Sequence, residues 1–275
     1  MQCLTLNNGV SIPQIGLGVW PLTDEQAYTA VSHALVTGYR HIDTARIYHN
    51  EAGVGRAVRD AGIRRQDIFL TTKLWNADQG YEAALRAFDA SLQRLDTDYV
   101  DLYLIHWPVP EQDLYVESYK ALERIHTDGR ARAIGVSNFT AATLDRLLAK
   151  TGIVPALNQI ELHPYFTQGR MRGLCAERSI TTGAWSPLAQ GGDLLAEHTL
   201  ARIAERHGKT PAQVVIRWHL QLGNVVIPRS MTHTRIEENF RVFDFDLGPE
   251  EVYDITALDN GGRIGPDPDT AGRQG

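Results

Sequence analysis

The feature that most constrains the fold is an eightfold alternation of short apolar segments with segments of helical periodicity. Strand-like runs occupy residues 14–20, 40–45, 68–75, 100–107, 133–138, 156–162, 180–186 and 225–230. Helical spacing of apolar residues covers 25–37, 51–61, 80–95, 114–128, 141–151, 169–178, 198–207, 211–222 and 233–240, and a late helix follows at 249–258. Strands that alternate with helices predict a parallel sheet with helical crossovers. Eight such units in 275 residues favour the α/β class and a (β/α)8 TIM barrel with extra helices near the C-terminus.

The first residues predict a β-hairpin ahead of the barrel. In LTLNNGVSIP, residues 4–13, Asn8 and Gly9 supply a turn, and the flanking residues alternate in polarity. The structural alternative to a barrel is an open doubly wound sheet, which usually carries G-x-G-x-x-G after its first strand. The nearest sequence, GLGVW at 16–20, lacks the third glycine. Because no linker-like segment divides the chain, we expect a single domain over residues 1–275.

Charge and cysteine content limit the partners and the compartment. The net charge of −6 gives no global attraction to nucleic acid or to an anionic membrane. Cys3 and Cys175 are too few for a disulfide framework, which favours a reducing compartment. The N-terminus lacks the pattern of a signal peptide, and no apolar run is long enough to span a membrane. We therefore expect a cytoplasmic protein without nucleic-acid or membrane partners.

Polar and aromatic residues gather where the predicted strands end. In a parallel barrel these ends share one rim, and the active site lies there. The strands end, in order, on Trp20; on Asp43, with Tyr48 in the loop; on Lys73 and Trp75; on His106 and Trp107; on Ser137 and Asn138; on Gln159 and Glu161; on Trp185 and Ser186; and on Arg229 and Ser230. Any one of these residues is more often structural than functional, but together they indicate a site.

Asp43, Tyr48, Lys73 and His106 come from three adjacent strand ends and form a chemically meaningful group. A buried carboxylate needs a partner, and Lys73, one strand over, is the best candidate. The ammonium beside the phenol is expected to lower the pKa of Tyr48 from about 10 and make it a general acid. His106 can donate a hydrogen bond to the same substrate oxygen.

This group suits a reaction in which a carbonyl oxygen gains negative charge and then a proton. Hydride addition to a carbonyl has this character. Because no side chain supplies a hydride, a nicotinamide cofactor is implied.

Seven motifs, in this order, give the chain a resemblance to the aldo-keto reductase family. They are GYRHIDTARIYHNE (38–51), TTKLW (71–75), LIHWP (104–108), AIGVSNF (133–139), NQIELHP (158–164), AWSPLAQG (184–191) and IPRSMTHTRIEEN (227–239). The likeness runs from about residue 4 to GPDPD at 265–269, and it is strongest to short bacterial and protozoal members of the 2,5-diketo-gluconate reductase and prostaglandin F synthase kind. It implies a catalytic tetrad of Asp43, Tyr48, Lys73 and His106.

The resemblance also implies a binding site for NADPH or NADP+. Ser137, Asn138 and Gln159 would bind the nicotinamide carboxamide, and Trp185 would stack on its ring. Ser186, Leu188, Gln190 and Gly191 would cross the pyrophosphate; Arg229, Ser230 and Arg235 would meet the 2′-phosphate; and Glu238 and Asn239 would meet the adenine. The family usually has lysine in place of Arg229. The charge is kept, so a preference for NADP is expected, and the extent of NADH use is left open.

The implied substrate is a small-molecule carbonyl compound: an aldehyde, ketone or dicarbonyl that is reduced to an alcohol. Trp20, Trp75 and Trp107, with His106, would line its pocket. The loop after His106 and the segment after the last helix are short, so we expect an open pocket. The family default is a monomer.

Two other functions remain as alternatives. The first is a metal-dependent hydrolase with ligands among His41, Asp43, Lys73 and His106. No H-x-H pair lies on the first strand, and such an enzyme has no need of Tyr48, so we expect no metal site. The second is a barrel without catalytic activity, which turnover of a generic aldehyde would exclude.

Overall fold

The computed structural model describes residues 2–271. Its strands are β1 (Cys3–Thr5), β2 (Ser11–Pro13), β3 (Leu17–Gly18), β4 (His41–Asp43), β5 (Phe69–Leu74), β6 (Val100–Ile105), β7 (Ala131–Ser137), β8 (Leu157–Glu161), β9 (Thr181–Trp185) and β10 (Val225–Ile227). Its α-helices are α1 (Asp24–Thr37), α2 (Glu51–Asp60), α3 (Tyr81–Leu95), α4 (Tyr115–Thr127), α5 (Ala141–Leu148), α6 (Gly169–Glu177), α7 (His198–His207), α8 (Pro211–Gln221), α9 (His233–Phe240) and α10 (Pro249–Thr256). Short 3-10 helices are η1 (Arg46–Tyr48), η2 (Arg65–Asp67), η3 (Asn76–Asp78) and η4 (Gly192–Ala196).

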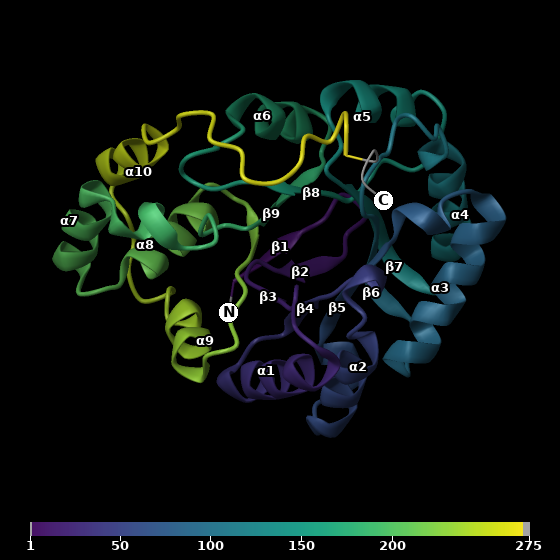
Figure 1. Ribbon diagram of the computed structural model, residues 1–275, viewed down its shortest axis with the longest axis horizontal. Coiled ribbons are helices and arrows are strands. Elements are labelled where there is room, and N and C mark those ends of the chain that lie inside the picture. The colour runs from purple at the N-terminus through teal and green to yellow at the C-terminus, as the bar shows by residue number, and fades with distance from the viewer. Residues whose placement is uncertain (1, 272–275) are drawn as a thin grey trace.

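The eight strands β3 to β10 form one parallel sheet in sequence order, surrounded by helices (Figure 1). Backbone contacts join its two edges, because Gly16 N donates to Val226 O at 2.9 Å and Gly18 N donates to Pro228 O at 3.0 Å. The predicted (β/α)8 barrel is therefore confirmed. The crossover between β9 and β10 holds two helices, α7 and α8, and two more helices, α9 and α10, follow the last strand. These are the expected extra helices near the C-terminus.

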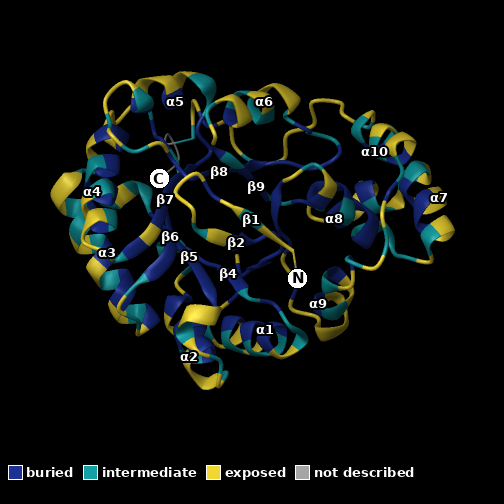
Figure 2. Ribbon diagram, turned by 180° about the vertical axis from the view of Figure 1, so that it is seen from behind, coloured by how far each residue is buried: buried dark blue, intermediate teal, exposed yellow. Residues whose placement is uncertain are grey.

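The predicted hairpin lies across the end of the barrel opposite the strand C-termini. Strand β1 pairs with β2 in antiparallel register, with Leu4 opposite Ile12. The hairpin side chains Leu6 and Ile12 pack in one buried cluster with Phe69, Leu102 and other residues that point inside the barrel. The view from behind shows the hairpin in front of the dark blue, buried strands (Figure 2).

Helix α1 shows how local sequence sets the boundaries of the elements. Thr23 is its N-cap: Gln26 N donates to the Thr23 hydroxyl, and Thr23 N donates to the Gln26 side chain, which is a capping box. The helix ends at Gly38, whose φ is 120°. Glycine adopts this positive φ readily because it has no Cβ.

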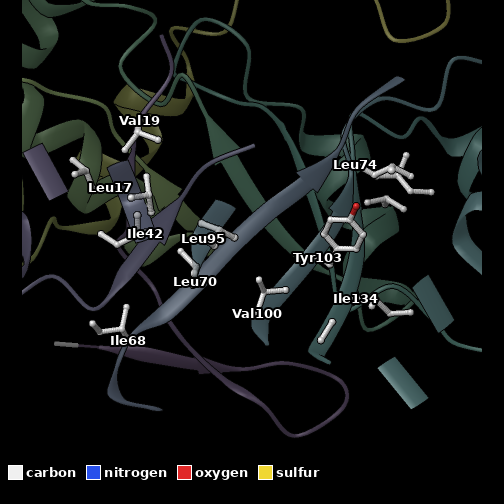
Figure 3. Close-up of a cluster of buried hydrophobic side chains, with 14 of the residues drawn as sticks. Leu17, Val19, Ile42, Ile68, Leu70, Leu74, Leu95, Val100, Tyr103 and Ile134 are labelled. Atoms are coloured by element: carbon white, nitrogen blue, oxygen red, sulfur yellow. The ribbon is translucent and has the colours of Figure 1, made fainter. Parts of the chain in front are cut away.

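Alternation along each strand sorts side chains into two layers. On β5, Leu70 and Leu74 face outward and join the large cluster beneath the helices, together with Ile42 and Tyr103 (Figure 3). Phe69, two residues before Thr71, belongs to the cluster inside the barrel. Because side chains alternate with a period of two, the inward set on β5 includes Lys73 at the end of the strand.

Within residues 2–271, no helix is long and apolar enough to cross a membrane. Each of the eight predicted strands overlaps an observed one, and each predicted helix overlaps an observed helix.

Candidate active site

Asp43 and Lys73 form a buried ion pair at the ends of β4 and β5. The Lys73 side chain is 1% exposed, and its Nζ donates a short hydrogen bond to Asp43 Oδ1. A second hydrogen bond, 3.0 Å long, joins Nζ to Thr44 O. The other carboxylate oxygen of Asp43 accepts from Gln159 Nε2 at 2.8 Å. The predicted pairing of Asp43 with Lys73 is confirmed, and it satisfies a charge that would otherwise be costly to bury.

Tyr48 and His106 lie next to this pair. Tyr48 is the last residue of η1, the single turn that follows β4. Its hydroxyl is 3.5 Å from His106 Nε2, and the two rings meet edge to face with centroids 5.6 Å apart. Lys73 Nζ is 5.4 Å from the centroid of the Tyr48 ring. The four residues predicted from three adjacent strand ends therefore converge on one spot.

The expected lowering of the Tyr48 pKa is wrong in direction. Burial of the phenol raises the pKa of Tyr48 well above its ordinary value, and the negative charge of Asp43 raises it further. Lys73 is already neutralised by Asp43, so the pair presents both signs of charge to the phenol. Tyr48 is consequently a neutral hydrogen-bond donor, and not an activated phenol with a lowered pKa.

His106 is a neutral imidazole in this site. Burial lowers its pKa well below 6.5, and the positive charge of Lys73 acts in the same direction. Its Nδ1 is buried and has no hydrogen-bond partner in residues 2–271. A neutral ring whose proton is on Nε2 directs its N–H toward the Tyr48 hydroxyl, where a substrate oxygen can be bound.

Two of the three predicted pocket tryptophans surround His106. Trp75 contacts the imidazole edge to face at 5.3 Å between centroids, and Trp107 lies nearly parallel to it at 6.4 Å. Trp107 also meets Trp185 at 6.4 Å. Trp20 differs, since it is 54% exposed and takes no part in these ring contacts.

The residues predicted to hold the nicotinamide are connected by hydrogen bonds. Asn138 Nδ2 donates to His106 O at 3.0 Å and to Ser137 Oγ at 3.1 Å, and Asn138 Oδ1 accepts from Trp185 Nε1 at 2.7 Å. Ser137 Oγ donates to Gln159 O at 2.8 Å. Gln159 in turn bonds Asp43, so the predicted cofactor residues and the tetrad form one network.

The segment predicted to cross a pyrophosphate has an unusual backbone. Ser186, Ala189, Gln190, Gly191 and Gly192 all have φ between 48° and 87°. Left-handed residues in a turn direct successive N–H groups to one side, which is a common way to bind an anion. This conformation fits a phosphate-bearing cofactor.

Two arginines are available for a second phosphate. Arg229 and Arg235 are exposed, and neither pairs with a carboxylate within the described residues. Ser230 is buried, and its hydroxyl contacts Thr232 N at 3.1 Å and Thr232 O at 3.3 Å. Of the predicted adenine residues, Glu238 is exposed and Asn239 is buried. The unpaired guanidinium groups fit a dianionic phosphate.

His41 was considered as a metal ligand in the sequence, but its hydrogen bonds involve none of Asp43, Tyr48, Lys73 and His106. Its Nδ1 is 3.3 Å from Pro13 O, and its Nε2 is 3.0 Å from Thr71 Oγ1. Burial lowers the pKa of His41 to about 4. Both ring nitrogens therefore have partners, and the contacts favour a structural role inside the barrel.

Two features of the site were not predicted. The Thr44 carbonyl accepts a hydrogen bond from Lys73. Every residue has a backbone carbonyl, so the residue type at position 44 could not predict this contact. The segment after α10 was expected to leave the pocket open, but it reaches the indole of Trp185: a Cβ on Gly265 would overlap Trp185 Cη2. Glu161, noted only as a strand end, binds this segment.

Comparison with known proteins gives matches over nearly the whole chain. The model of the Aldo/keto reductase family matches residues 14–260. A protein of Mycolicibacterium smegmatis named aldo-keto reductase is 57% identical over 267 residues, which cover 97% of each chain. Methylglyoxal reductase DkgA of Yersinia pestis is 50% identical over 270 residues, 98% of this chain and 97% of the relative. A crystal structure of a Gox0644 mutant in complex with NADPH is 46% identical, with a TM-score of 0.94 over 98% of both chains.

We expect Lys73→Met to lower the free energy of unfolding by about 3–5 kcal/mol, because it leaves the Asp43 charge buried with one hydrogen bond from Gln159. Urea denaturation followed by circular dichroism measures this difference. The matched control is Lys120→Met, which removes a half-exposed i,i+3 pair with Glu117 and should cost less than about 1 kcal/mol.

The double variant Asp43→Asn/Lys73→Met removes both charges and should be more stable than Lys73→Met alone. Equal unfolding free energies for Lys73→Met and the parent protein would contradict the assignment of a buried pair.

Proposed function

This chain belongs to the aldo/keto reductase family, and we propose that it reduces small aldehydes, ketones and dicarbonyls to alcohols with NADPH, using Tyr48 as the acid. It is an oxidoreductase of the NADP-dependent kind. The observation that supports the detailed proposal is the convergence of Tyr48 and His106 beside the Lys73–Asp43 pair.

The proposed substrate class rests on the aromatic rings around His106 and on the name of a relative. Trp75 and Trp107 flank His106 and offer flat apolar surfaces around one polar point. These surroundings suit a small or aromatic molecule with a single reacting oxygen. The Yersinia pestis relative is named a methylglyoxal reductase, so we include small dicarbonyls among the proposed substrates.

Tyr48 and His106 act on the carbonyl oxygen. The hydroxyl of Tyr48 stays protonated because its pKa is raised, so it can donate a hydrogen bond and then its proton to an oxygen that gains charge. His106 Nε2–H stabilises the same oxygen without carrying a net charge. The two donors fix the orientation of the carbonyl group relative to the tryptophans.

Lys73 and Asp43 form an ion pair next to the ring of Tyr48. The Lys73 ammonium group lies 5.4 Å from the centroid of the Tyr48 ring, and its pairing with Asp43 keeps the charge beside the neutral phenol balanced. Asp43 keeps Lys73 in place and, through Gln159, links the pair to the end of β8. Their contribution is position and local charge.

NADPH, when bound, supplies the hydride that reduces the carbonyl carbon. Ser137, Asn138 and Gln159 would hold its carboxamide, and Trp185 would provide the surface for its ring. The segment Ser186, Leu188, Gln190 and Gly191 would bind the pyrophosphate through its left-handed backbone. Arg229, Ser230 and Arg235 would bind the 2′-phosphate, with Glu238 and Asn239 at the adenine.

We further propose that the protein works as a cytoplasmic monomer that has no nucleic-acid partner. Its net charge is −6, and its two cysteines, Cys3 and Cys175, are unpaired in the structure. Size-exclusion chromatography with light scattering tests the oligomeric state; a mass near 30.6 kDa is expected, and a stable dimer would contradict the proposal.

Replacing Tyr48 by phenylalanine should reduce kcat by at least roughly 10²–10⁴-fold, the usual contribution of a general acid. NADPH binding should stay close to that of the parent protein, because the phenol acts on the substrate oxygen. Steady-state kinetics with methylglyoxal and an aromatic aldehyde, with NADPH absorbance as readout, measures the loss. A variant that keeps more than about a tenth of the activity would show that another group is the acid.

The pH profile of reduction distinguishes a neutral donor from an activated phenol. The pKa of Tyr48 is raised, so the acid form persists, and loss of activity through its ionisation should begin only above pH about 10. The pKa of His106 is lowered, so its protonation should not appear near neutral pH. We expect a flat kcat between pH about 7 and 9 at saturating NADPH. An inflection within that range would instead support a lowered pKa for Tyr48.

Arg235→Ala should weaken NADPH binding by roughly ten- to a hundredfold, since charge-assisted hydrogen bonds are worth about 1.5–3 kcal/mol. NADH has no 2′-phosphate, so its binding should barely change. Quenching of tryptophan fluorescence, titrated with each cofactor, provides the measurement. The matched control Arg241→Ala alters the opposite end of α9 and should affect neither cofactor. Equal weakening of NADPH and NADH by Arg235→Ala would refute the assignment to the 2′-phosphate.

A further inference from the structure

The segment that follows α10 runs along the rim of the barrel and forms neither helix nor strand. It passes over α6 toward α5 (Figure 1). Asn260 N and Gly262 N both donate to Tyr165 O, at 3.2 and 3.0 Å. Arg263 stacks on the ring of Phe166 at 4.6 Å and is exposed to solvent. Residues 263–265 belong to no helix or strand, so no regular backbone hydrogen bonds fix their position.

One buried carboxylate holds this segment at the active site. Glu161 Oε1 accepts from Ile264 N at 2.5 Å, and Glu161 Oε2 accepts from Gly265 N at 2.8 Å. The side chain of Glu161 is fully buried, and His163 Nε2 lies 3.0 Å from Oε1. Glu161 is the last residue of β8, two positions beyond Gln159.

The charge of Glu161 is retained in spite of its burial. Burial acts to raise the pKa of this carboxyl, but the hydrogen bonds from His163, Ile264 and Gly265 outweigh it, and the pKa lies below the ordinary value. A buried carboxylate is costly unless hydrogen bonds satisfy it. Two of its partners here are backbone groups of an irregular segment, so the ionised carboxylate and the position of that segment depend on each other.

The segment held by Glu161 touches Trp185. A methyl group at Gly265 would overlap Trp185 Cη2 and would lie 2.9 Å from Glu161 Oε2. At the other end of the indole, Nε1 donates to Asn138 Oδ1 at 2.7 Å. Trp185 is thus fixed at both ends, by Asn138 and by the backbone at Gly265.

We propose that Glu161 is a positioning residue for the cofactor: it holds residues 264–265 against Trp185 and so fixes the indole plane on which the nicotinamide stacks. The inference rests on the proposed function of Trp185. Glu161 itself touches neither cofactor nor substrate. Its effect should fall on the nicotinamide end, which NADPH and NADH share.

The first test is Glu161→Gln, which keeps the size of the side chain but replaces one acceptor oxygen by an amide nitrogen. Trypsin should then cleave after Arg263 roughly ten- to a hundredfold faster, since one charge-assisted bond to the segment is lost. Mass spectrometry of the protein without added cofactor identifies the released peptide, which begins at Ile264. The control Glu177→Gln makes the same change on the exposed face of α6 and should leave the rate unaltered.

The second readout is the affinity for each cofactor. Glu161→Gln should weaken NADPH and NADH by the same factor, about tenfold, and raise KM for NADPH while kcat at saturating cofactor stays within about twofold. Gly265→Ala, which keeps Glu161 but pushes on Trp185, should weaken both cofactors similarly. Gly173→Ala, where an added Cβ meets nothing within 4 Å, serves as its control.

Each outcome separates the inference from the proposed function. Unchanged cleavage after Arg263 in Glu161→Gln would overturn the holding role of Glu161. Faster cleavage with unchanged affinity for both cofactors would overturn the positioning of Trp185. If Glu161→Gln does not fold, Gly265→Ala tests the Trp185 contact alone, and unchanged cofactor affinity in that variant would refute it. Failure of the parent protein to bind NADPH would instead reject the proposed function, and the cleavage result would still stand.

Discussion

The ion pair between Lys73 and Asp43 is the interaction on which the rest of the site depends. Neither charge can be buried alone, because an uncompensated charge in the interior costs several kcal/mol. The pair joins the ends of β4 and β5, and its hydrogen bond from Gln159 extends it to the end of β8. Through this pair the barrel places a positive and a negative charge beside the Tyr48 phenol, which burial leaves neutral and able to donate.

The geometry of the barrel explains why these residues meet. On each strand the inward positions recur every second residue, so a chain that fills the lower layers with apolar side chains can end on a polar one. Strand β5 shows the pattern. Phe69 packs inside the barrel, and Lys73, four residues later and on the same face of the strand, lies at the rim. A one-residue shift of register would turn Lys73 toward the helices and leave Asp43 without its partner.

Much of the fold could be predicted from sequence, because the periodicity of apolar residues repeats eight times and each repeat supports the others. The strand ends also predicted that Asp43, Tyr48, Lys73 and His106 lie close together, since a parallel barrel brings all of the strand ends to one rim. The pKa of Tyr48 was predicted in the wrong direction, because the depth of burial and the nearness of Asp43 are set by three-dimensional packing. The contact of Gly265 with Trp185 was also missed, since no periodic pattern places an irregular segment relative to a distant strand.

The most direct test of this account is the ionisation of Tyr48 itself, followed by carbon-13 NMR in protein labelled at the tyrosine Cζ. The spectrum of Tyr48→Phe assigns the resonance by its absence. If burial and the balanced pair keep the phenol neutral, the chemical shift should stay constant up to pH about 10, the ordinary pKa of tyrosine. A titration with a midpoint between pH about 7 and 9 would contradict it, and would mean that Lys73 acts on Tyr48 as an unpaired positive charge.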